Sequence, residues 1–315
     1  MPPTPLHAVT ATYGHTAALR DGRIAPAGFD LRFTEYPVIV QAFRRMVRNL
    51  EFDVCEMAIT TYLCAREHGV AFTALPLFVM RGFHHGAIVR HRGSGITGPK
   101  DLEGRRVGVN RGYTVTTGVW VRGILQDEYG VDLDRVTWVL SGDEHVQSYR
   151  PPANVVPMPE GGNLADLLRA GEIDAAIGIE ADGQDVVPLI EHPDEAAHDA
   201  LRSRGLYPIN HLVVVRDEVL AAHPELPAAL FAAYAEAKRG YLAELSAGTI
   251  AEPTAHDKRY RRVLDLLGGD PLPYGIAANH AMIELLISHA TRQRIVTRPV
   301  QPADVFATAT HDLAG

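Results

Sequence analysis

A glycine- and threonine-rich segment is the first candidate for chemistry. Residues 112–117, GYTVTT, join a predicted strand to a predicted helix. The start of a helix presents free N–H groups and partial positive charge, which suits a carboxylate or a phosphate. Thr114, Thr116 and Thr117 add hydroxyl donors. We therefore expect this segment to contact an anionic ligand, and plain capping of the helix is the alternative.

A second candidate segment carries Arg81, His84 and His85. A guanidinium can hold a carboxylate through two parallel hydrogen bonds. An imidazole can donate a proton near neutral pH or position a phenolate. Neighbouring side chains of an extended segment point to opposite faces, so we expect at most one of the two histidines to face a ligand squarely. A surface arginine and a structural histidine are the alternatives.

Other polar residues stand at the ends of predicted elements. Tyr13 and His15 end the first predicted strand, where they could contact a ligand or only shape the turn. Glu56 follows a buried strand, where its carboxylate could orient a histidine, accept a ligand hydroxyl, or serve as a helix-dipole partner. Trp120 is expected to pack in the core. Arg122 is as consistent with a surface or inter-lobe salt bridge as with a ligand clamp.

The hydrophobic spacing predicts an α/β protein. Strands are expected at 7–12, 51–57, 105–110 and 172–178, and helices at 37–50, 60–68, 115–129 and 163–171. The last third is expected to be helical near 225–246, 256–267 and 276–293. A helix, a turn and a buried strand recur around Asp53 and Asp174, which indicates two similar lobes.

Two extended segments, 86–90 and 212–216, are expected to cross between these lobes. One lobe is then discontinuous and comprises 1–86 and 212–315, while the other is 87–211. Open α/β sheets bind ligands at the carboxyl ends of their strands, so we expect a cleft between the lobes. His211 sits at the second crossing, where it could face the ligand or bond to the backbone of a hinge.

Several runs resemble the 4,5-dihydroxyphthalate decarboxylase family. They are FDVCEMAITTYLCAREHG from Phe52, LPLFVMRGFHHGAIVRHRGSGITGPKDLEGRRVGVN up to Asn110, TVTTGVWVRGILQDEYG from Thr114, and YPINHLVVVR from Tyr207. The resemblance covers most of 7–216 and, more loosely, the helical tail. It implies a two-lobed type II periplasmic-binding-protein-like fold, with two mixed sheets flanked by helices.

One position departs from the family pattern. There, Arg-x-Phe is followed by Arg-His, whereas this chain has MRGFHH, so that His84 replaces a fixed cation. A phthalate carries two carboxylates, and the departure therefore bears on the substrate. His85 matches the histidine of the family, and the resemblance also places a histidine at His211.

The resemblance implies non-oxidative decarboxylation of a hydroxylated aromatic acid such as 4,5-dihydroxyphthalate. Arg81 and the 112–117 segment would hold the carboxylate, a histidine paired with Glu56 would stabilise electron push from a phenolate, and His85 or His211 would protonate the ring carbon. No organic cofactor is implied. A divalent metal held by His85, His211 and Glu56 is a less favoured alternative. The rival functions are a solute-binding protein of an ABC-type system and another lyase or synthase on the same fold.

The composition is that of an ordinary globular protein. The chain has 315 residues, a net charge of −8 and no long basic run, which argues against a nucleic-acid partner. No stretch approaches the roughly 18 apolar residues of a membrane span, and the N-terminus lacks the features of a secretory signal. Cys55 and Cys64 are too few for a disulfide framework. We expect a cytoplasmic protein whose partner is a small aromatic carboxylate; a homo-oligomer is compatible with the sequence.

Overall fold

The computed structural model describes residues 2–315 and divides them into two compact units. The first holds the chain up to Gly82, Ile209–Glu284 and Pro299–Gly315, and the second holds Phe83–Pro208 and Leu285–Arg298. The sequence grouped all of 212–315 with the first lobe. Contacts place Leu285–Arg298 with the second unit, because Gln293 in this segment hydrogen-bonds Arg122 and the backbone of Val119.

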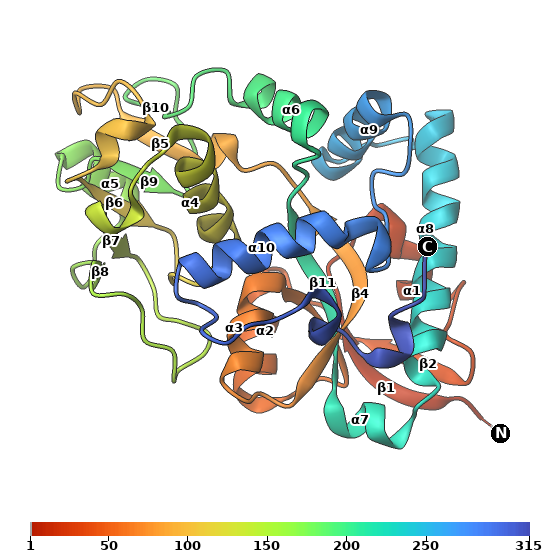
Figure 1. Cartoon of the computed structure of the whole chain (residues 1–315). Coiled ribbons are helices and arrows are strands. Elements are labelled where there is room, and N and C mark those ends of the chain that lie inside the picture. Colours follow the sequence, from red (N-terminus) through yellow and green to blue (C-terminus); the bar gives the residue numbers. More distant parts are fainter. Residues whose placement is uncertain (1) are drawn as a thin grey trace. The chain divides into compact units, whose positions relative to one another are not determined.

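The first unit is built on a five-stranded mixed sheet in the order β2-β1-β3-β11-β4 (Figure 1). β1 runs parallel to β2 and β3, whereas β11 is antiparallel to β3 and β4. The strands are β1 (Thr4–Val9), β2 (Phe29–Phe33), β3 (Val54–Ala58), β4 (Phe72–Arg81) and β11 (Ile209–Arg216). The helices are α1 (Ala17–Arg20), α2 (Val40–Asn49), α3 (Ile59–Glu67), α7 (Asp217–Ala222), α8 (Leu226–Ala247), α9 (Ala255–Leu267) and the start of α10 (His280–Arg292).

The second unit is built on a six-stranded mixed sheet in the order β10-β5-β9-β6-β7-β8. β6 runs parallel to β7 and β9, while β5 is antiparallel to β9 and β10. The strands are β5 (Ile88–His91), β6 (Arg106–Val109), β7 (Thr137–Leu140), β8 (Val155–Pro157), β9 (Ala175–Ile177) and β10 (Val186–Pro188). The helices are α4 (Thr116–Tyr129), α5 (Leu164–Ala170), α6 (Pro193–Arg204) and the end of α10.

The helix signals of the sequence are confirmed where capping chemistry is strongest. Asn163 caps α5 by accepting from the N–H groups of Ala165 and Asp166. α5 and α4 end at Gly171 and Gly130, whose φ values of 73° and 65° are the left-handed conformation that glycine adopts without strain. The expected helices of the last third are present as α8, α9 and α10.

Two expectations for extended segments are wrong in detail. The first strand ends at Val9 rather than at residue 12, because the Thr10 hydroxyl and the Ala11 N–H bind Glu56 instead of continuing the ladder. The segments expected to cross between lobes lie inside the sheets, in β5 and β11, and residues His85–Ala87 form a 3₁₀ turn. The chain passes between units a few residues earlier, after Gly82 and after Pro208.

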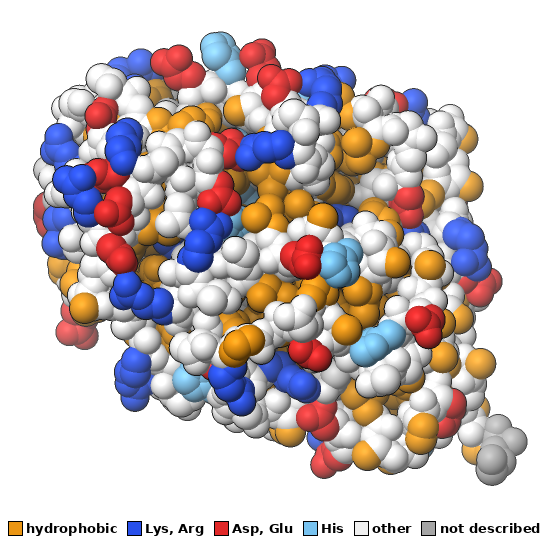
Figure 2. Space-filling model, in the orientation of Figure 1, with side chains coloured by type: hydrophobic (Ala, Val, Ile, Leu, Met, Phe, Trp, Pro, Cys, Tyr) orange, Lys and Arg blue, Asp and Glu red, His pale blue; other side chains and the backbone are white. Residues whose placement is uncertain are grey.

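The surface and core have ordinary compositions. Acidic and basic side chains are interspersed over the face seen in Figure 2. Cys55 and Cys64 are buried and, within residues 2–315, form no disulfide bond. Within residues 2–315, none of the helices combines the length and the apolar character that crossing a bilayer requires.

Candidate active site

A buried carboxylate, Glu56, is the centre of a polar cluster in the first unit. Its Oε1 accepts from the Tyr13 hydroxyl at 2.7 Å and lies 2.7 Å from Nδ1 of His211. Its Oε2 accepts from the Thr10 hydroxyl at 2.9 Å and from the Ala11 N–H at 2.8 Å. Both oxygens therefore have two donors each, which is what a carboxylate without solvent contact requires.

The sheet register explains why Glu56 and His211 meet. In the antiparallel pair of β3 and β11, Glu56 is opposite Val213 and His211 is opposite Ala58. Glu56 and His211 are therefore diagonal neighbours on one face of the sheet, within reach of long side chains. Because Val9 of β1 pairs with Cys55 of β3, Thr10 arrives beside Glu56 from the other side.

The hydrogen bonds keep Glu56 ionised. Burial alone would raise its pKa, yet the bonds from His211, Ala11 and Tyr13 lower the pKa of Glu56 overall. Because a carboxylate can only accept, Nδ1 of His211 carries the proton in this pair, and Nε2 is the nitrogen left for other chemistry. The Glu56 side chain is 0% exposed and the His211 side chain 14% exposed, so the histidine is the member that a ligand can reach.

Tyr13 and His15 extend this cluster. Burial, and then the charge of Glu56, raise the pKa of Tyr13, so its hydroxyl stays a donor. The His15 ring stacks on Tyr13 with centroids 5.2 Å apart and exposes none of its surface. Burial lowers the pKa of His15 from 6.5 to about 4, and its imidazole is therefore neutral at pH 7. Of the two residues expected at the end of the first strand, Tyr13 touches Glu56 and His15 lies behind Tyr13.

A polar pocket of about 380 Å³ opens beside the cluster, within the first unit. Thr10 and Ala11, which hold Glu56, form part of its wall. Arg20 lines the same pocket and donates to the Thr10 carbonyl at 2.6 Å and to Glu35 at 2.7 Å. The pocket lies where β1 ends, the edge at which α/β sheets bind ligands.

His84 and His85 are both buried at the start of the second unit, exposed 5% and 1%. Because His85 begins a 3₁₀ turn, the alternation expected of an extended segment does not apply. His85 Nε2 lies 3.0 Å from a carboxylate oxygen of Glu128, which also binds Arg204 at 2.7 Å. Burial alone would raise the pKa of Glu128, but His85 and Arg204 lower it overall. His85 differs from His211 in exposure, because His85 has almost no exposed surface.

Arg81 ends β4 in the first unit and is 2% exposed. Its Nη1 donates to the Asn279 side chain at 2.8 Å, and its carbonyl accepts from Arg259 at 3.3 Å. The expected surface alternative for this arginine is therefore wrong, because the guanidinium is built into the polar interior.

An internal carboxylate occupies the threonine segment of the second unit. Glu144 accepts from the Tyr113 N–H, from the Thr114 N–H at 3.3 Å and from the Thr114 hydroxyl at 2.7 Å. Gly112 makes room for it, since a Cβ at this position would lie 2.6 Å from a Glu144 oxygen. The carboxylate bound by this segment belongs to the chain itself, so contact of the segment with a ligand stays a prediction. Thr116 and Thr117 follow in the first turn of α4, Thr116 buried and Thr117 partly exposed.

Arg122 is completely buried in the second unit, so the surface salt bridge that we considered for it is wrong. It donates to the Tyr113 carbonyl at 2.6 Å and to Gln293 at 2.7 Å, and its guanidinium lies 3.8 Å from the centre of the Tyr113 ring. Trp120 is also fully buried, as expected, and meets His289 edge to face. Arg122 thus stabilises the backbone of the 112–117 segment through the carbonyl and the ring of Tyr113.

The metal alternative would require His85, His211 and Glu56 to come together in one site. Within residues 2–315, no group of three or more His, Cys, Asp or Glu side chains is placed to hold an ion. Glu56 and His211 belong to the first unit and His85 to the second.

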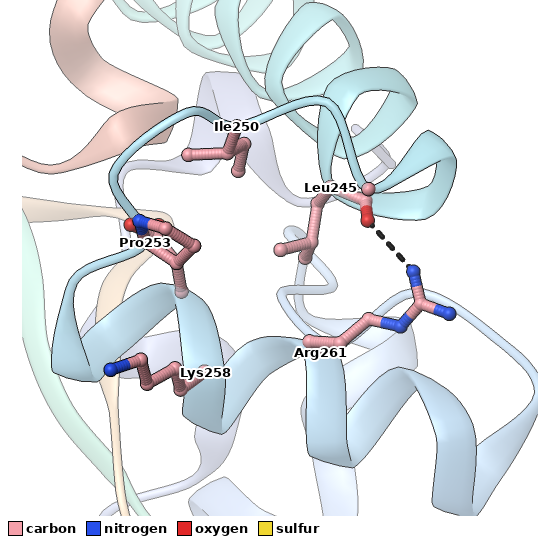
Figure 3. Close-up of a pocket in the computed structure, with 7 residues that line it drawn as sticks. Leu245, Ile250, Pro253, Lys258 and Arg261 are labelled. Atoms are coloured by element: carbon pink, nitrogen blue, oxygen red, sulfur yellow. Dashed lines mark hydrogen bonds between the residues drawn. The ribbon is translucent and has the colours of Figure 1, made fainter.

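A second pocket, of about 260 Å³, lies between the end of α8 and α9 (Figure 3). Leu245, Ile250 and Pro253 form its apolar wall, and Arg261 is held at its edge by the Leu245 carbonyl at 3.0 Å. Asp257 lines it as well, but its carboxylate is engaged by Tyr241 and Thr254.

Sequence reasoning missed three residues of these clusters. Thr10 was assigned to a strand, and only the β1–β3 register reveals its bond to Glu56. Glu144 lies in a loop without a motif, 30 residues from the segment that it fills. His256 belongs to no motif of the sequence, yet it is half-buried and meets Tyr13 edge to face at 5.3 Å. Its position in the first turn of a predicted helix gave no signal of that contact.

The fold is that of type II periplasmic binding proteins. The alkanesulfonate-binding protein SsuA from Xanthomonas axonopodis pv. citri aligns with a TM-score of 0.54 at 14% identity, covering 98% of this chain and 99% of that one. The desulfurization enzyme DSZB aligns with a TM-score of 0.56 at 16% identity, covering 96% of each chain. At these identities the likeness shows the shared fold alone, and that fold carries both binding proteins and an enzyme.

Sequence relatives narrow this class to one family. The 4,5-dihydroxyphthalate decarboxylase of Comamonas testosteroni is 32% identical over 326 aligned positions, covering 96% of each chain. That of Pseudomonas putida is 32% identical over 185 positions, covering 56% of this chain and 70% of its own. No family model matches the sequence. The chain belongs to the 4,5-dihydroxyphthalate decarboxylase family and is an enzyme, a decarboxylase, which confirms the resemblance read from the sequence.

Burial of neutral His15 predicts a pH dependence of stability. Because the folded pKa of about 4 is below the unfolded value of 6.5, the unfolded chain binds the proton more readily between these values. The contribution is complete above pH 6.5 and is lost as the pH falls toward 4, a change of about 3 kcal/mol. His15→Phe, which keeps the ring stacked on Tyr13, should flatten the urea midpoint over this range. His280→Phe, at a half-exposed histidine, should not. Equal slopes in His15→Phe and the wild type would contradict the burial of a neutral imidazole.

Proposed function

We propose that this enzyme removes one carboxylate from a hydroxylated aromatic acid of the 4,5-dihydroxyphthalate kind, without an oxidant or an organic cofactor. The observation that carries the proposal is the Glu56–His211 pair, in which a fully buried carboxylate holds one nitrogen of a partly exposed histidine. The names of the two relatives supply the class of substrate.

His211 is the proposed proton donor. When the bond between the ring and its carboxylate breaks, the electron pair stays on the ring carbon, carbon dioxide leaves, and the carbon takes up one proton. Nε2 of a protonated His211 can give that proton, and Glu56 at Nδ1 stabilises the imidazolium beforehand and fixes the ring orientation. His85, the other candidate, has its Nε2 on Glu128, and we propose for it a positioning role in the second unit.

The hydroxyl groups of the substrate supply the electron push. A phenolate para or ortho to the reacting carbon raises the electron density at that carbon and so favours uptake of the proton that replaces the carboxylate. A base near the ring hydroxyl therefore favours the reaction. The Tyr13 hydroxyl, which Glu56 holds, is the polar group of the first unit that we propose for this contact.

The carboxylate that leaves needs a cationic or N–H-rich seat. We propose a candidate seat in each unit: Arg81 in the first, and in the second His84 and the 112–117 segment with Thr114, Thr116 and Thr117, supported by Arg122. In the present structure Glu144 holds the Tyr113 and Thr114 donors. The substrate carboxylate would take the place of the Glu144 carboxylate, which offers the same chemical group.

A turnover assay tests the proposal directly. The purified protein mixed with 4,5-dihydroxyphthalate and a panel of hydroxybenzoates should release carbon dioxide with loss of the ultraviolet band of one substrate. His211→Ala should lower kcat about a hundredfold or more, since general acids contribute about 10²–10⁴. Glu56→Gln should lower kcat in the same direction, because it removes the charge that stabilises the imidazolium. His280→Ala, at an exposed histidine paired only with Glu284, is the matched control.

Two outcomes of this assay would contradict the proposal. A wild-type rate in His211→Ala would remove His211 as the proton donor. Tight binding of every compound without turnover would favour the solute-binding alternative that the fold also serves.

Removal of the internal carboxylate tests the proposed seat. Glu144→Ala should lower the KM for the dicarboxylate several-fold and strengthen inhibition by phthalate, because the ligand no longer competes with a tethered carboxylate. Thermal stability without ligand should fall, since the buried Tyr113 N–H loses its acceptor. Glu160→Ala removes an exposed charge from the same unit and is the control. A raised or unchanged KM in Glu144→Ala would show that Glu144 only braces the loop.

A further inference from the structure

A group of aromatic rings behind Tyr13 contains more buried polar atoms than the protein satisfies. His15 meets Tyr260 edge to face at 6.0 Å, and His256 lies 6.1 Å from Tyr260 and 5.3 Å from Tyr13. Among residues 2–315, neither nitrogen of His15, nor Nδ1 of His256, nor the Tyr260 hydroxyl has a hydrogen bond of ordinary geometry. A polar group buried in this way costs about 1–3 kcal/mol unless water or a ligand satisfies it.

The four atoms differ in what can reach them. His15 exposes none of its surface and Tyr260 only 1%, so both act from behind the other rings. His256 is half-buried. It stands in the first turn of α9, with its ring edge to face with that of Tyr13. His256 therefore differs from the other two residues. Its Nδ1 is buried without a hydrogen bond, but part of its side chain is exposed.

His256 also lies within the electrostatic reach of the reacting pair. The charges of Glu56 and His211 both act on its imidazole, although burial and then Arg259 dominate and lower the pKa of His256. The chain of contacts runs from His256 to Tyr13, from the Tyr13 hydroxyl to Glu56, and from Glu56 to His211. The partly exposed imidazoles of His211 and His256 thus lie on either side of the Tyr13–Glu56 pair.

We propose that His256 is a specificity-determining residue that hydrogen-bonds the second of two adjacent ring hydroxyls, while the Tyr13 hydroxyl, held by Glu56, contacts the first. The ligand class is an aromatic acid with an ortho-dihydroxyl edge, and the inference rests on the proposed function. A single imidazole recognises one hydroxyl, whereas a site that hydrogen-bonds two discriminates strongly against a ligand that lacks one of them.

The test compares two substrates that differ by one hydroxyl, 4,5-dihydroxyphthalate and 4-hydroxyphthalate. His256→Phe keeps a ring against Tyr13 and Tyr260 and removes both nitrogens. The ratio of kcat/KM for the dihydroxy over the monohydroxy compound should fall about tenfold or more, the factor that one hydrogen bond supplies. The fall should come from the dihydroxy substrate. His280→Phe should leave the ratio unchanged.

A ratio within twofold of the wild type in His256→Phe, with an unchanged melting temperature, would overturn the inference. Wild-type protein that converts neither compound would refute the proposed function instead. Calorimetric binding of the same two compounds to wild type and His256→Phe then still decides the inference, because the hydroxyl preference is read without turnover: loss of the preference supports the role of His256, and its persistence overturns it.

Discussion

The buried carboxylate of Glu56 is the interaction on which the rest of the first unit depends. An ionised group without solvent contact is tolerated only when its lone pairs are occupied. Four donors meet this requirement, from the end of β1, the turn that follows it, and β11. The same requirement fixes where β1 stops, where Tyr13 points and which nitrogen of His211 carries the proton. Stability and chemistry therefore share one set of hydrogen bonds.

The second unit also surrounds a carboxylate with hydrogen-bond donors, but at the start of a helix. There the backbone N–H groups at the start of α4 form a seat for negative charge, and the chain fills it with its own Glu144. Arg122 stacks on the Tyr113 ring and donates to the Tyr113 carbonyl, which holds the backbone of the 112–117 segment in place. The first unit thus surrounds Glu56, whose carboxylate is fixed by four donors. The second unit holds Glu144, whose carboxylate we propose that a ligand replaces.

Much of this could be predicted from the sequence where the signal is local. The caps of α5 and the end of α4 follow from Asn163, Gly171 and Gly130, whose preferences depend on their own backbone. The free N–H groups of the 112–117 segment were also predicted from the sequence, but the Glu144 side chain that they bind was not. Pairings across the sheet were not, because the register of β3 and β11 joins residues 155 positions apart. The resemblance to a family indicated His211, but neither Thr10 nor His256 carries a pattern that reveals its neighbours.

The separation of Glu56 and His211 along the chain also bears on how the protein is made. β11 lies between β3 and β4 in the first sheet, yet it follows the whole of Phe83–Pro208 in the sequence. During synthesis, β3 and β4 leave the ribosome long before the strand that joins them. Glu56 is then without its histidine, and the sheet has a gap at its centre until residue 216 has emerged. Pairings of such long range form slowly, so the first sheet is completed, and Glu56 meets His211, only after the second unit has been synthesised.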